Sequence, residues 1–152
     1  MSWIKKILYI EADRKLKSIY DKVKGPDDNI DNVLLIHSLR PHSLVGHMSL
    51  YKNVLHNANN TLPKWYLESI GVYVSYLNKC DYCVTHHFEG LKRLLNDDEK
   101  ADNFMNAIKN HALKGFFEAQ FFQGIKYAEK LTNSLHTVKK EDIDILKNLG
   151  FS

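Results

Sequence analysis

The chain has 152 residues, of which 44% are hydrophobic and 26% are charged, and its formal net charge is +3 at pH 7. This length fits one compact domain or one subunit of an assembly, and the composition excludes disorder as the default state. The lysines alternate with acidic residues along the sequence, whereas a nucleic-acid-binding surface gathers its basic residues on one face. We therefore expect a folded protein without a nucleic-acid partner.

The N-terminal segment, MSWIKKILYIEADRK, contains a short apolar patch that two lysines interrupt. It is too short to span a membrane, and no small-residue cleavage site follows it. No window elsewhere reaches the ~18 uncharged apolar residues of a transmembrane helix. The sequence thus predicts a soluble, cytoplasmic protein with no membrane partner.

Apolar residues recur at helical spacing along the chain, whereas the alternation typical of strands is scarce. The first predicted helix, residues 12–24, ends at Gly25-Pro26. Its apolar stripe consists of Leu16, Ile19, Tyr20 and Val23. A short apolar stretch follows over residues 32–39, and Pro41 opens a helix that runs toward Asn57.

A long helix is predicted from the turn that contains Pro63 to about Lys79. We expect it to be central, because its apolar residues occupy more than one face: Trp65, Leu67, Ile70, Val74 and Leu77. After a break at residues 78–81, Asp81 is the candidate N-cap of a helix over residues 82–95. Further helices are predicted over residues 99–109, 116–132 and 141–149. The sequence therefore predicts one all-α domain, residues 1–152, of about seven helices.

The two cysteines of the sequence, Cys80 and Cys83, have C-x-x-C spacing. In a reducing compartment this spacing points to redox chemistry or to half of a metal site. The two thiols can close a disulfide without large backbone movement. If Cys83 lies in the first turn of a helix, the unpaired N–H groups and the helix dipole favour its thiolate, which is the nucleophilic form.

Two titratable residues accompany the cysteines. His87 follows Cys83 by four residues, so on a helix it shares the face of that thiol and can exchange a proton with it. Glu68 precedes Cys80 by twelve residues, on the preceding predicted helix. A carboxylate there can orient a histidine or a water and act as the base of a proton relay.

Glu68, the run Cys80-x-Tyr82-Cys83 and His87 together resemble the active-site signature of the alkyl hydroperoxidase D and carboxymuconolactone decarboxylase superfamily. Three sequence segments outside this motif are similar to segments of the superfamily's peroxidase-related branch: residues 37–41 (HSLRP), 127–132 (YAEKLT) and 146–151. The resemblance spans most of the chain. It implies an all-helical fold, assembly as a homotrimer or homohexamer, and a family-like sequence that continues past Ser152.

The resemblance also implies an activity. Members reduce peroxides through a cysteine-pair disulfide, in antioxidant defence, and a dithiol protein or small thiol recycles it. Carried over by position, Cys83 is the peroxidatic thiol, Cys80 resolves the sulfenate, and Glu68 and His87 form the relay. Tyr82 stands where the best-known members have a histidine, and a phenol with a pKa of about 10 is a poor base that still donates a hydrogen bond.

Three other functions fit parts of the pattern. A structural zinc site would use Cys80, Cys83 and His87, but zinc takes four ligands and His86 points about 100° away on a helix. We therefore expect no metal and no cofactor. A decarboxylase-like lyase of the same superfamily is the second alternative, although such members generally lack the cysteine pair. The third is a non-catalytic helical binding module.

The remaining histidines and aromatic residues have ordinary structural explanations. We expect His37, His42 and His47 to be structural, because a five-residue interval does not keep one helical face. We expect core packing or a subunit interface, rather than a ligand pocket, for the phenylalanine cluster: Phe116, Phe117, Phe121 and Phe122.

Overall fold

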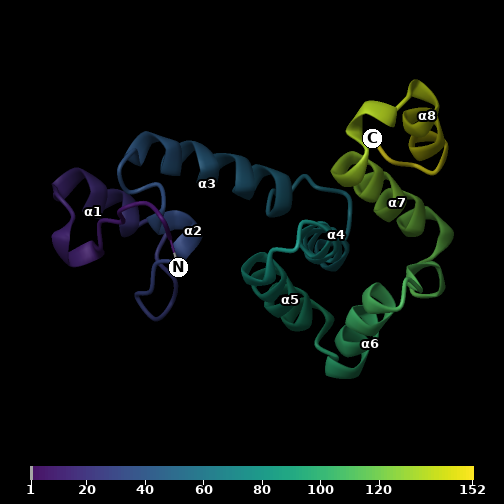
Figure 1. Cartoon of the computed structure of the whole chain (residues 1–152), viewed down its shortest axis with the longest axis horizontal. Coiled ribbons are helices and arrows are strands. Elements are labelled where there is room, and N and C mark those ends of the chain that lie inside the picture. The colour runs from purple at the N-terminus through teal and green to yellow at the C-terminus, as the bar shows by residue number, and fades with distance from the viewer. Residues whose placement is uncertain (1) are drawn as a thin grey trace. The chain divides into compact units, whose positions relative to one another are not determined.

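The computed structural model describes residues 2–152, and these residues form α-helices and short 3-10 helices without a strand (Figure 1). The α-helices are α1 (Arg14–Tyr20), α2 (Asn32–Leu35), α3 (Pro41–Leu55), α4 (Lys64–Leu77), α5 (Asp81–Leu95), α6 (Asp98–Lys109), α7 (Ala119–Asn133) and α8 (Lys140–Asn148). The 3-10 helices are η1 (Tyr9–Glu11), η2 (Leu113–Gly115) and η3 (Leu135–Thr137). The prediction of an all-α fold is confirmed. None of the described helices combines the length and the apolar character that crossing a bilayer needs.

The helices form two compact units, one ending at Asn60 and one beginning at Thr61. The expectation of a single domain over the whole chain stays a prediction. In the first unit, three residues of the predicted stripe lie in α1 and face inward: Leu16 and Tyr20 are buried, and Ile19 packs against the same core cluster. The predicted end of this helix is wrong, because α1 ends at Tyr20 and Val23 reaches the cluster from the turn that follows.

The second unit is built around α4, which packs against α5 and α7. Its buried core includes Tyr66, Val72, Leu91 and Phe104. The predicted phenylalanine cluster belongs to this core, with Phe117 buried and the other three packed against it. The central position predicted for α4 is therefore confirmed within this unit.

Several predicted helix ends are corrected. The N-cap of α5 is Cys80, because its sulfur accepts the hydrogen bond from the Cys83 N–H, and Asp81 is instead the first helical residue. Pro63 is the N-cap of α4 rather than part of its first turn. α7 begins only at Ala119, because Phe116 closes the 3-10 turn of η2 and the chain turns before the helix starts.

A buried phenol joins the central helix to α7. The Tyr66 hydroxyl donates a hydrogen bond to the Phe121 carbonyl oxygen at 2.9 Å, and the side chain is fully buried. Burial raises the pKa of Tyr66 to about 12. A tyrosine in an unfolded chain has a pKa of about 10. The stability that the buried, protonated Tyr66 contributes is therefore fully present below pH ~10 and is lost as the pH rises through about 12.

We expect the free energy of unfolding to fall between about pH 10 and 12, with roughly 2 kcal/mol of the fall due to Tyr66. Tyr66→Phe should lose about 1 kcal/mol at neutral pH, because its hydrogen bond is gone, but it should fall less steeply at alkaline pH. Urea unfolding of both proteins across this range measures the difference. Parallel curves would contradict the assignment.

Candidate active site

The cysteine pair lies where the chain turns back from α4 into α5, two helices that pack together in the second unit (Figure 1). Lys79 adopts a left-handed conformation with φ of 55°, which residues other than glycine adopt rarely. The Cys80 N–H then donates to the Ser75 carbonyl oxygen at 3.0 Å. This tight turn fixes Cys80 at the start of α5.

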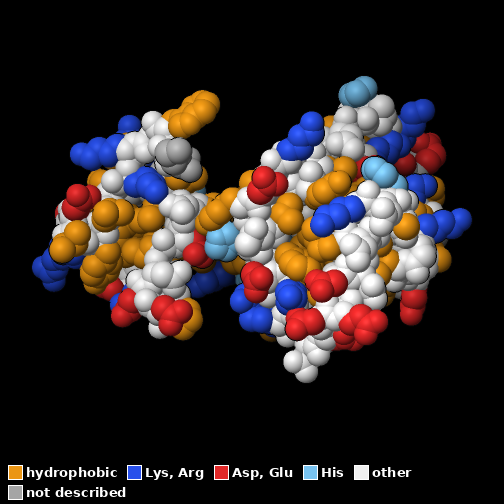
Figure 2. All heavy atoms as spheres, turned by 60° about the horizontal axis from the view of Figure 1, so that its bottom comes forward, with side chains coloured by type: hydrophobic (Ala, Val, Ile, Leu, Met, Phe, Trp, Pro, Cys, Tyr) orange, Lys and Arg blue, Asp and Glu red, His pale blue; other side chains and the backbone are white. Residues whose placement is uncertain are grey.

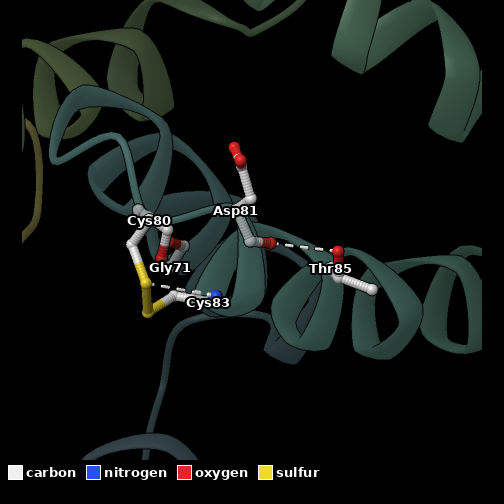
Figure 3. The surroundings of a disulfide bond; sticks show 6 residues. Gly71, Cys80, Asp81, Cys83 and Thr85 are labelled. Carbon is white, nitrogen blue, oxygen red and sulfur yellow. Dashed lines mark hydrogen bonds between the residues drawn. A yellow bond between two sulfur atoms is a disulfide. The ribbon is translucent and has the colours of Figure 1, made fainter. Parts of the chain in front are cut away.

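Cys80 and Cys83 form a disulfide, with their Cα atoms 5.3 Å apart (Figure 3). The Cys83 N–H donates a hydrogen bond to the Cys80 Sγ at 3.3 Å, so this sulfur takes the place of a capping oxygen. Both residues are half-buried. The pair therefore meets the free N–H groups and the positive end of the α5 dipole.

Glu68 and His87 form a hydrogen-bonded pair between α4 and α5. The Nδ1 atom of His87 lies 2.7 Å from Oε2 of Glu68. Glu68 is 7% exposed, whereas the His87 side chain is 26% exposed. A carboxylate is an acceptor, so Nδ1 carries the proton of this bond and Nε2 is the nitrogen that can exchange a proton with another group.

The second unit thus collects four of the five predicted site residues into two adjacent pairs. Cys80 and Cys83 make the disulfide, and Glu68 and His87 make the carboxylate–imidazole pair. His87 lies one helical turn after Cys83, on the same face of α5. The site therefore holds a disulfide-bonded cysteine pair one helical turn from a histidine that is hydrogen-bonded to a carboxylate.

The fifth residue, Tyr82, lies on a different face of α5. Its ring contacts the ring of His86, with the centroids 4.3 Å apart, and Tyr82 is 39% exposed. Positions 82 and 83 point about 100° apart on a helix. Tyr82 is therefore displaced around α5 from the face that carries Cys83 and His87.

Comparison with known proteins rests on solved structures, because no protein-family model matches the chain and no curated protein shows significant similarity to it. An uncharacterized peroxidase-related protein from Ralstonia eutropha JMP134, described as an alkylhydroperoxidase AhpD core, is 21% identical with a TM-score of 0.79. That match covers 98% of this chain and 76% of the other.

A second solved structure agrees. An uncharacterized peroxidase-related protein from Silicibacter sp. TM1040 is 22% identical with a TM-score of 0.77, over 100% of this chain and 80% of the other. This chain has the AhpD-like fold. The resemblance stated from the sequence is confirmed at the level of the fold.

Around the two pairs, three small residues of α4 and α5 had no predicted role. Ser75 is buried, and its hydroxyl donates to the Gly71 carbonyl oxygen at 2.6 Å, while its own carbonyl holds Cys80. Gly71 and Gly90 lie where the helices meet at the Glu68–His87 pair. Their only sequence signal is the helical spacing that puts them on the faces of Glu68 and His87.

The three histidines expected to be structural, His37, His42 and His47, lie in the first unit. His37 Nδ1 is 2.8 Å from the Ser43 Oγ, and its ring centroid is 5.0 Å from that of His47. Burial, followed by the nearby His47, lowers the pKa of His37. The two rings meet although their spacing does not fit one helical face, because His37 precedes α3 and His47 lies within it.

Within residues 2–152, no group of three or more Cys, His, Asp or Glu residues is arranged to hold a metal ion.

Proposed function

We propose that this protein is a thiol-dependent peroxidase or disulfide reductase that uses Cys80 and Cys83 as a redox pair in antioxidant defence. The observation that carries the proposal is the disulfide at the start of α5 together with the Glu68–His87 hydrogen bond beside it. A thiol pair supplies two electrons, and the imidazole supplies or removes the proton that accompanies them. The shared fold of two peroxidase-related proteins supports the same chemistry.

The proposed reaction balances in three steps. The Cys83 thiolate attacks the outer oxygen of a hydroperoxide, the O–O bond breaks, and the alcohol leaves with one proton, so the sulfur becomes a sulfenic acid. The Cys80 thiol then attacks that sulfur, the disulfide forms, and water leaves. A dithiol protein or small thiol finally reduces the disulfide with two electrons and becomes oxidised itself.

His87 and Glu68 act in this reaction as a proton relay. The Nε2 atom of His87 takes the proton from the Cys83 thiol and returns one to the departing alkoxide. Glu68 accepts the hydrogen bond from Nδ1 at 2.7 Å, which fixes the tautomer and stabilises the imidazolium while it exists. The carboxylate is buried, so water competes weakly for this bond.

The hydrogen bond onto Cys80 supports the division of roles between the thiols. A backbone N–H that donates to the Cys80 Sγ stabilises negative charge on that atom. Cys80 is thus the better leaving group when the electron donor attacks Cys83 in the reductive step. The same bond favours Cys80 as the thiolate that resolves the sulfenic acid.

A hydroperoxide turnover assay with a panel of dithiol donors tests the proposal. The reduced protein should lose two thiols per chain on exposure to peroxide, and mass spectrometry should show a loss of two hydrogens within one chain. A non-catalytic binding module would keep both thiols. Thiols that persist under excess peroxide, or oxidation only to cross-linked dimers, would contradict the proposal.

We also propose that the protein assembles as a homotrimer or homohexamer in the cytoplasm, where a reducing thiol pool can recycle the disulfide. Large apolar side chains reach the surface of the first unit, where Figure 2 shows hydrophobic groups in orange. Ile10 is 83% exposed, Leu50 67% and Val54 55%. Burial of such groups in a subunit interface is favourable. Light scattering that shows a stable monomer at micromolar concentration would contradict this assembly.

A further inference from the structure

Two glycines interrupt the inner faces of α4 and α5. Gly71 lies in the middle of α4, and Gly90 lies in the second half of α5. A glycine inside a helix destabilises it by about 1 kcal/mol relative to alanine, because the unfolded chain has more conformational freedom to lose. Neither glycine has a positive φ. Backbone conformation therefore does not require glycine at either position. The structure instead indicates that there is too little room for a Cβ atom.

Gly71 makes room for the imidazole of His87. A Cβ atom at position 71 would lie 2.6 Å from Nδ1 and 2.8 Å from both Cγ and Cε1 of that ring. Carbon atoms do not approach other heavy atoms so closely, so the ring would have to move. The ring is also bonded through Nδ1 to Glu68 at 2.7 Å. Any movement away from position 71 therefore disturbs the bond that orients the imidazole.

Gly90 makes room for the other member of the pair. A Cβ atom at position 90 would lie 3.1 Å from Cδ of Glu68 and 3.3 Å from each carboxylate oxygen. This is tight rather than forbidden, so the carboxylate would shift by a few tenths of an ångström. The arrangement is reciprocal: the glycine of α4 faces the histidine of α5, and the glycine of α5 faces the glutamate of α4.

The other glycines of the chain show that this environment is specific to the pair. An added Cβ at Gly46 or Gly115 would meet nothing within 4 Å, and at Gly124 it would meet the core side chains of Tyr66 and Phe151. Gly71 and Gly90 are thus the two helical glycines that face the Glu68–His87 pair.

We propose that Gly71 and Gly90 are positioning residues that seat the Glu68–His87 pair between α4 and α5. The absence of a side chain at these positions lets the two helices approach closely enough for Nδ1 and Oε2 to meet. The catalytic consequence rests on the proposed function, because a seated imidazole matters to the rate only if His87 relays a proton. The structural part, coupling between Gly71 and His87, does not depend on any activity.

Gly71→Ala tests the proposal, with Gly46→Ala as the matched control in the open middle of α3. Gly71→Ala should lose the ring N–H signal of His87 in the NMR spectrum of labelled protein, identified by its absence in His87→Ala. Its thiol oxidation rate should fall by about 10²-fold, the effect of a roughly 1 Å misplacement, and its pH profile should change. Gly90→Ala should have a smaller effect in the same direction. Gly46→Ala should leave the signal and the rate unchanged.

The double variant Gly71→Ala/His87→Ala keeps the test decisive if Gly71→Ala alone does not fold. The added methyl should fit the space that the imidazole has left, so the double variant should be at least as stable as His87→Ala and as active. The inference is overturned if Gly71→Ala keeps the His87 signal and the rate, or if the double variant is much less stable than His87→Ala. A wild-type protein without thiol oxidation would refute the proposed function, and the stability and NMR comparison would still decide the inference.

Discussion

Cys83→Ser is expected to abolish peroxide-dependent turnover and to form no sulfenic acid. A serine hydroxyl does not ionise near neutral pH, so the nucleophile that attacks the peroxide is lost. Cys80→Ser should also stop turnover, but after the first step, because the sulfenic acid on Cys83 then has no thiol to resolve it. A dimedone-type probe with mass spectrometry should label Cys83 in Cys80→Ser and label nothing in Cys83→Ser.

Cys80→Ser is also a structurally conservative variant. Serine is among the preferred N-cap residues, so its hydroxyl can accept the Cys83 N–H bond that the sulfur accepts now. Its loss of turnover should therefore come without loss of fold, which circular dichroism checks. A probe that labels Cys80 in the Cys83→Ser variant would reverse the two roles, and the hydrogen bond onto Cys80 would then be the feature that activates it.

The periodicity of apolar residues predicted well which helix faces are buried. It predicted less well where a helix begins or ends, because a cap or a turn sets that position. The stripe of α1 is an example, since Leu16 and Tyr20 are buried as their spacing predicts. The start of α5 is a counterexample. Asp81 is the better N-cap by residue type, but the left-handed turn at Lys79 places Cys80 there instead. Such a turn depends on a single backbone conformation that periodicity does not record.

The candidate site divides in the same way between local and tertiary information. The relation of Cys83 to His87 lies within one helix, so their spacing alone predicts a shared face. The bond between His87 and Glu68 joins two helices. Their positions in the sequence indicated only that Glu68 could orient a histidine or a water, and the resemblance named His87 as its partner in the relay, because spacing cannot state how α4 and α5 align. For the same reason, the role of Gly71 and Gly90 could not be predicted from the sequence. A glycine shows its role only when the facing side chain is known.

Glu68→Gln and His87→Ala should each slow thiol oxidation of the reduced protein by about 10²–10⁴-fold, the usual size of general acid–base assistance. Glu68→Gln keeps the shape of the side chain but removes the charge that stabilises the imidazolium. His87→Ala removes the proton carrier itself. Because the two residues act as one unit, the double variant should be about as slow as His87→Ala alone. Stopped-flow measurement of thiol loss at several pH values gives all three rates.

Tyr82 supplies the control for this relay. Position 82 points about 100° away from position 83 on α5, and its ring contacts that of His86, so Tyr82→Phe should change the rate little. Tyr82→His should raise peroxidase turnover at neutral pH, because it restores the histidine that the best-known members of the resembled superfamily have at this position, a residue that titrates near pH 7. If Tyr82→Phe is as slow as His87→Ala, the phenol is itself a member of the relay and the Glu68–His87 pair does not act alone. If both Glu68→Gln and His87→Ala keep the wild-type rate, the pair is structural, and deprotonation of Cys83 must come from the N-terminus of α5.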